Sequence, residues 1–121
     1  MAVAPPLAWR ARALTEARVK SGLWVAAYVR RCHAANCPAF VTRKGDPDAG
    51  AILIVIDRLD GTSRLYGRAR DGAGALVFAP LTDWADALTV QAAIDKQVKF
   101  DSDVWLIAVE SRTGEAFLDE Y

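Results

Sequence analysis

The sequence predicts an α+β protein: a mostly antiparallel meander sheet of four to five strands with helices packed on one face. Apolar residues recur at helical spacing over residues 22–35 and 87–99. Short runs rich in valine, isoleucine and aromatic residues are separated by glycine, proline and aspartate, as in successive strands. One run, 51–58, is apolar at every position through Ile56, which indicates a central strand buried on both faces.

The chain has 121 residues, of which 53% are hydrophobic and 25% charged, and it is predicted to form one domain over 1–121. No internal repeat, low-complexity tract or long linker divides it. A chain of this length buries roughly two-thirds of the surface that its unfolded form exposes, which suffices for one core. The alanine-rich residues 1–18 are expected to be a loosely held helical N-terminal arm.

The first predicted helix rests on Val25, Val29 and Cys32, which recur at helical spacing. Pro38 prevents the helix from continuing shortly beyond its end. The alternative is a strand over 23–30, because tryptophan, valine and tyrosine also favour sheets.

The middle of the chain predicts an antiparallel meander. Three strands are expected at 39–44, 51–58 and 63–70, with turns at 45–50 and at Asp60-Gly61. Residues 75–81 are expected to add a fourth strand, which Pro80 ends or marks as an edge.

The C-terminal part predicts a helix, a buried strand and a hairpin. The helix over 87–99 carries a stripe that includes Val90 and Ile94, and Asp86 or Thr89 is its expected cap. The apolar run 104–111 follows as the strand, and the chain is expected to return as a hairpin along 115–119.

The stretch Gly45-Asp46-Pro47-Asp48-Ala49-Gly50 allows two interpretations. Aspartate followed by proline suits a type I turn, and glycine permits positive φ where the chain enters the next strand. Alternatively, Asp46 and Asp48 are oxygen ligands for a cation, joined by Asp101 and Asp103 if the two loops meet. The turn is favoured, because a calcium loop needs more oxygens and a late glutamate.

Cys32, His33 and Cys37 are candidate zinc ligands. Their spacing is irregular and no second ligand pair follows, so free thiols are expected instead. The sequence therefore predicts no metal and no cofactor.

Charge is unevenly divided along the chain. Residues 1–70 carry twelve Lys or Arg and five Asp or Glu, whereas 71–121 carry three and ten. A basic nucleic-acid-binding face is a second hypothesis, made from Arg30, Arg31, Arg43, Lys44, Arg64, Arg68 and Arg70 with tyrosines as stacking groups. The sequence pI of 6.6 argues against it.

Four blocks carry a resemblance: KSGLWVAAYVRRC, PAFVTRKGDPDAGAILI, LDGTSRLYGRA and QVKFDSDVWLIAVE. Over about residues 18–118 the chain resembles a family of small uncharacterised alphaproteobacterial proteins, a domain of unknown function. Its most specific piece is an RRGDPDAG-like block, in which Lys44 replaces the second arginine. The resemblance implies an α+β domain and carries no activity, substrate or catalytic residue.

The absence of a nucleophile elbow, a phosphate loop and a dinucleotide fingerprint makes an enzyme the less favoured class. The start lacks a signal-peptide pattern and no apolar run reaches membrane-spanning length, so a cytoplasmic protein without membrane contact is expected.

The favoured function is a non-enzymatic protein-interaction or regulatory module, with self-association into a homodimer as one form. The alternatives are nucleic-acid binding through the basic first seventy residues, and an enzyme or metal-binding protein with the acidic site. The candidate binding residues are Trp9, Arg30, Arg31, Arg43, Lys44, Asp46 and Asp48.

Overall fold

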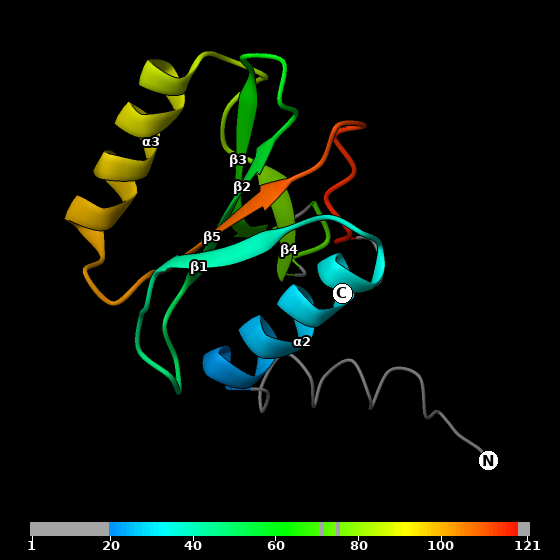
Figure 1. Ribbon diagram of the computed structural model, residues 1–121. Coiled ribbons are helices and arrows are strands. Elements are labelled where there is room, and N and C mark those ends of the chain that lie inside the picture. Colours follow the sequence, from blue (N-terminus) through cyan, green and yellow to red (C-terminus); the bar gives the residue numbers. More distant parts are fainter. Residues whose placement is uncertain (1–19, 71, 75, 119–121) are drawn as a thin grey trace.

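The structure is a computed structural model and describes residues 20–70, 72–74 and 76–118. Figure 1 shows a sheet with one helix on each side. The described elements are α2 (Ser21–Ala34), β1 (Ala39–Arg43), β2 (Ile52–Asp57), β3 (Ser63–Arg70), β4 (Leu76–Pro80), α3 (Ala87–Phe100) and β5 (Trp105–Glu110). The α+β class and the mostly antiparallel sheet are confirmed, and 22–35 is a helix and not a strand.

The sheet has the strand order β1-β5-β2-β3-β4, in which β2 and β5 run parallel and the other neighbours antiparallel. The meander through β2, β3 and β4 is confirmed. The hairpin expected between β1 and β2 is wrong, because β5 lies between them. The burial of the strands explains this order: β5 is apolar and alternately buried, whereas β1 is largely exposed and suits an edge.

Both faces of the sheet are covered. Ile54 and Ile56 of β2 pack in one core with α2, and Leu53 packs in a second core with Val90 and Ile94 of α3. The expectation that the helices lie on one face is therefore wrong. Alternate residues of a strand point to opposite faces, so an entirely apolar strand needs cover on both sides.

The core beneath α2 is aromatic. The Trp24 ring stacks on Tyr28 and on Phe78 of β4, with centroid distances of 5.1 and 5.0 Å. The Tyr28 hydroxyl donates to the carbonyl of Ala116 at 2.6 Å, which ties the segment after β5 to the helix. Residues 111–118 form a loop there, and the hairpin expected along 115–119 is absent from its described part.

The second helix begins as the sequence predicts. The Asp86 carboxylate accepts a hydrogen bond from the backbone N–H of Thr89 at 2.8 Å, which is an N-cap. Among the described residues, no helix is both long enough and apolar enough to cross a membrane.

Candidate functional site

The loop over 45–50 joins three elements. The backbone N–H of Asp46 donates to the carbonyl of Asp103 at 2.9 Å, just before β5. The indole N–H of Trp105 donates to the carbonyl of Asp46 at 2.8 Å. The loop is thus a crossover from the sheet edge to β2, fastened to the start of β5.

The same loop satisfies the start of α2. The first N–H groups of a helix lack partners within it, and α2 has no side-chain cap. The N–H of Ser21 donates to the carbonyl of Asp48 at 3.3 Å, and the N–H of Gly22 donates to the carbonyl of Pro47 at 2.9 Å. The Ser21 hydroxyl also donates to the carbonyl of Gly50. The loop therefore has a structural role at the start of β5 and at the start of α2.

The carboxylates of the two acidic pairs do not form a cation site. Asp46 Oδ2 accepts from the N–H groups of Asp48 and Ala49, and Asp101 Oδ1 accepts from the N–H of Asp103. The backbone brings the loop over 45–50 close to the turn over 101–103, but the carboxylates of Asp46 and Asp101 each bond N–H groups of their own turn. Within the described ranges, no three His, Cys, Asp or Glu residues are grouped so as to hold a metal.

The cysteine and histidine candidates also have structural surroundings. Cys32 is fully buried in the core under α2, and burial raises the pKa of its thiol. The Nε2 atom of His33 lies 3.1 Å from the carbonyl oxygen of Ala39, at the beginning of β1. Both cysteines, Cys32 and Cys37, are free.

The outer edge of β1 exposes two large apolar residues, Phe40 and Val41. The N–H of Glu110 donates to the carbonyl of Pro38 at 2.9 Å, so these two residues form a hydrogen-bonded pair. Hydrogen-bonded and non-bonded pairs alternate in an antiparallel ladder. Val41, three positions along, therefore directs its N–H and C=O away from β5. Its side chain is 45% exposed, and that of Phe40 is 54% exposed.

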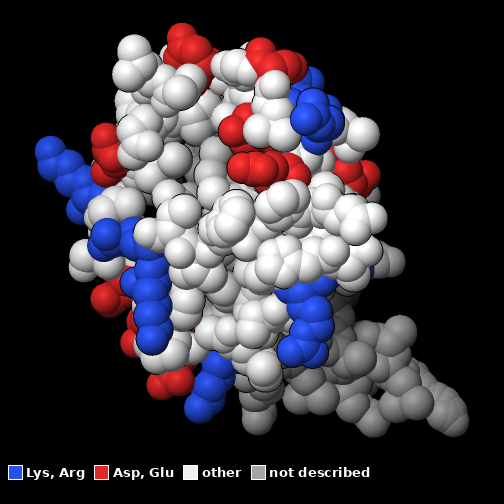
Figure 2. Space-filling model, in the orientation of Figure 1, with Lys and Arg blue, Asp and Glu red and all other residues white. Residues whose placement is uncertain are grey.

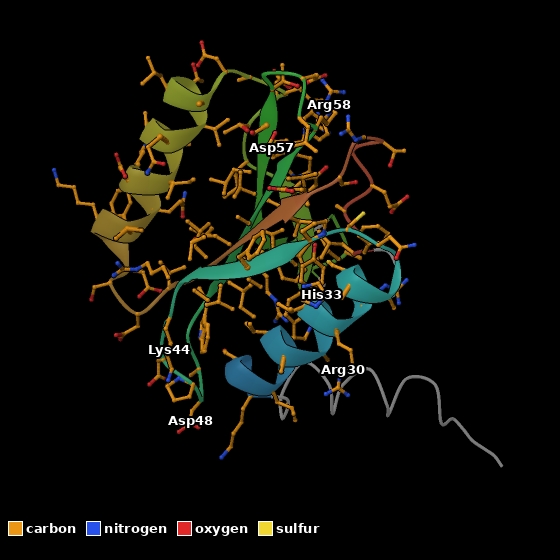
Figure 3. The ribbon with its side chains drawn as sticks, in the orientation of Figure 1. Arg30, His33, Lys44, Asp48, Asp57 and Arg58 are labelled. Atoms are coloured by element: carbon orange, nitrogen blue, oxygen red, sulfur yellow. The ribbon has the colours of Figure 1, made fainter. Side chains whose placement is uncertain are left out.

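An apolar groove of 490 Å³ lies beside this edge, between β1 and α2. It is lined by Gly22, Val25, Ala26, Val29, Val41 and Trp105. Arg30 and His33 complete the lining. Figure 3 shows His33 near β1 and Arg30 extending from α2 on the side away from the sheet.

The basic candidates divide between this edge and the rest of the sheet. Arg30 is exposed and lines the groove, and Lys44 is exposed just after the end of β1. Arg43 is half-buried and donates through Nη2 to the carbonyl of Ser102 at 2.7 Å, and Arg31 is half-buried on α2. Figure 2 shows an uncharged band across the face that carries β1, with basic and acidic groups on both sides of it.

The basic residues of β3 lie elsewhere. The Arg64 guanidinium is 5.2 Å from the centre of the Trp84 ring, and that of Arg68 is 5.2 Å from the centre of the Phe78 ring. β5 and β2 separate this strand from β1, so the basic set does not form one cluster. Trp9 lies outside the described residues.

The sequence-based predictions missed the groove and the bare edge. The sequence contained a sign of the exposed edge, because Phe40 and Val41 precede the first charged residue of their strand. Natural edge strands usually carry charges or proline, which discourage pairing with another strand. The opposite edge strand, β4, follows that rule and ends at Pro80, which has no N–H to offer.

These features define a class: a small α+β domain whose sheet has an apolar edge, beside a groove, that no described residue covers. The profile of a family described as protein of unknown function (DUF1491) matches residues 19–119, and the chain belongs to this family. The expectation that the chain belongs to a family of unknown function is thus confirmed. A comparison with curated proteins finds no significant match.

Solved structures of this family are similar over most of their length. The crystal structure of a DUF1491 family protein from Caulobacter crescentus CB15 is 34% identical, with a TM-score of 0.75, and the match covers 83% of this chain and 94% of that chain. An NMR structure of a DUF1491 family protein from the same organism is 33% identical, covers 84% and 93%, and has a TM-score of 0.72. A protein from A. tumefaciens is 30% identical, covers 78% and 86%, and has a TM-score of 0.69.

Proposed function

We propose that the protein is an interaction module that binds an extended segment of a partner protein, which pairs with β1 as an additional strand. The observation that carries the proposal is the outward N–H and C=O of Val41, next to an apolar groove. In this mode of recognition, main-chain hydrogen bonds supply affinity and pockets for alternate side chains supply specificity.

The backbone at the edge supports a short pairing with defined ends. At one end, the imidazole of His33 lies against the outward carbonyl of Ala39, so this acceptor is already occupied. At the other end the register shifts between Val41 and Arg43, which interrupts a regular ladder. A docked segment therefore pairs chiefly with Val41, and its neighbouring side chains supply the remaining contacts.

The groove supports binding of side chains from that segment. Alternate residues of a docked strand point toward α2, where Val25, Val29 and Trp105 form an apolar wall. A volume of 490 Å³ falls within the range of about 300–1,000 Å³ that is typical of ligand pockets. On the opposite face, the exposed ring of Phe40 offers an aromatic contact.

Self-association through the same edge is the competing form of this function. Trp9 stays a predicted contact, whether the partner is a different protein or a second copy of the chain. Nucleic-acid binding has weaker support, because Arg64 and Arg68 stack on aromatic rings away from β1. The acidic site has no supporting geometry, since Asp46 and Asp101 bond their own turns.

The first test selects binders from a display library of random twelve-residue peptides with the full chain as bait. We expect enriched peptides with alternating apolar residues. Their affinity for the variant Val41→Pro should fall at least about tenfold, because proline removes an outward N–H that supports a docked strand. The Val41 N–H has no part in the β1–β5 ladder, so the variant should fold, which circular dichroism checks.

A matched pair of lysine variants provides the control. Val41→Lys places a charge at the bare edge and should weaken peptide binding, whereas Val77→Lys places one on the opposite edge strand, where the valine is 38% exposed. Equal binding by both variants, or a library that yields no binder, would contradict the proposal. A dimer by light scattering that becomes a monomer in Val41→Lys would instead show that the edge binds a second copy.

A further inference from the structure

The described lining of the groove carries positive charge at Arg30 and contains no carboxylate. Lys44 is exposed just after the end of β1 and does not line the groove. The two neighbouring loops carry Asp46, Asp48, Asp101 and Asp103, but none of them lines the groove. Asp48 lies 3.6 Å from the Lys20 ammonium, and the carboxylates of Asp46 and Asp101 accept from N–H groups of their own turns. The groove therefore presents uncompensated positive charge at its rim.

Arg30 is placed to use this charge on a bound segment. Arg30 lines the groove, and Figure 3 shows its side chain extending from α2 on the side away from the sheet, so a segment docked on β1 must cross the groove to reach the guanidinium. Long basic side chains commonly bury their stems along apolar surface and keep the charged end in water. No described residue pairs with its guanidinium in an ion pair. A guanidinium in this position can bind a carboxylate through two hydrogen bonds.

We infer that the segment docked on β1 belongs to a different protein and carries an acidic side chain, Asp or Glu, that pairs with Arg30 beside its apolar residues. The inference rests on the strand-addition function proposed above. It specifies the partner as an extended segment in which apolar positions alternate and at least one carboxylate lies at the rim of the groove.

The same charge argues against a second copy of this chain as the occupant. A symmetric dimer through β1 would use the same surface on both subunits. It would bring the Arg30 side chains of both copies into one interface, where like charges repel. Repulsion between like charges therefore disfavours a homodimer through β1, whereas Arg30 attracts a carboxylate on a different partner.

The test compares peptide selections on the wild type and on Arg30→Glu. We expect Asp and Glu to be enriched in wild-type binders, and Lys and Arg to be enriched when the charge is reversed. In fluorescence-anisotropy titrations at low salt, an enriched peptide should bind the wild type about fivefold more tightly than its counterpart with Lys for Glu. The preference should invert in Arg30→Glu and shrink with added salt.

Arg112→Glu is the matched control, because Arg112 is also an exposed arginine and lies on the loop after β5, outside the groove. It should bind like the wild type. If Val41-dependent peptides are selected but show no acidic preference, or if Arg30→Glu leaves the preference unchanged, the charge inference is overturned while strand addition stands. If no peptide depends on Val41, both fail.

Discussion

Asp46 illustrates how much structure one residue of a turn can carry. Its N–H bonds the carbonyl of Asp103, its carbonyl accepts from the Trp105 indole, and its carboxylate accepts from two N–H groups of its own turn. The sequence indicated the last of these, because aspartate before proline commonly bonds the backbone of a turn. The other two contacts involve residues nearly sixty positions away, which no local pattern specifies.

The glycine that precedes Asp46 also depends on residues distant in the sequence. A Cβ added at Gly45 would overlap the carbonyl oxygen of Asp103 and would lie 2.7 Å from Cδ1 of Trp105. We therefore expect Gly45→Ala to lower the free energy of unfolding by about 1–3 kcal/mol, as overpacking does. Urea unfolding followed by tryptophan fluorescence measures the change.

Gly72→Ala is the control for that substitution. A Cβ at Gly72 meets nothing within 4 Å, and its φ is not in the left-handed region. The stability of this variant should equal or slightly exceed that of the wild type, because alanine has less conformational freedom in the unfolded chain. A Gly45→Ala protein as stable as Gly72→Ala would show that the crossover loop is not packed against β5 as described.

At the scale of elements, the two helices begin in different ways. α3 is capped by Asp86 from its own sequence, and that cap could be predicted. α2 has no side-chain cap and uses the carbonyls of Pro47 and Asp48 instead. Its start therefore requires the crossover loop to be in place. The bounds of α2 were predictable from the spacing of its apolar residues, whereas the groups that satisfy its first turn were not.

The Asp86 cap predicts a specific dependence of stability on pH. The Thr89 N–H donates to the Asp86 carboxylate and holds the pKa of this group below its usual value. A carboxyl whose pKa is lower in the folded state stabilises the fold above its unfolded pKa, and this contribution is lost as pH falls through the folded pKa. Asp86→Ala should therefore be less stable than the wild type at pH 7.

The difference in unfolding free energy between the wild type and Asp86→Ala should shrink as pH falls below about 4. Urea unfolding at pH 7 and pH 3 measures it. Asp86→Asn distinguishes the contribution of the hydrogen bond from that of the negative charge. Asparagine keeps an oxygen that accepts from the Thr89 N–H, but it carries no charge that acid could neutralise. A gap between wild type and Asp86→Ala that stays constant with pH would contradict the assigned cap.

At the scale of the whole molecule, the strand order decides where the surfaces lie. Each strand could be located from its apolar run, but such runs do not specify neighbours, and β5 enters between β1 and β2 from the far end of the sequence. The expectation that both helices lie on one face was wrong for a reason visible in the sequence, because the apolar run of 51–56 needs cover on both faces of the sheet. The bare edge and its groove follow from this order, since β1 becomes the edge that α2 only partly covers.

The strand order also determines how the basic residues are distributed, and this yields the last prediction. Arg30 and Lys44 lie near β1, whereas Arg64 and Arg68 lie two strands beyond β5 and stack on aromatic rings. A single strand of nucleic acid is held by a continuous basic groove with free aromatic faces. We therefore expect a fluorescent oligothymidine to bind more weakly than about 10⁻⁴ M at physiological salt, as measured by anisotropy. Binding that is tight and falls steeply between low and physiological salt would show several phosphate contacts and would favour the nucleic-acid hypothesis over strand addition.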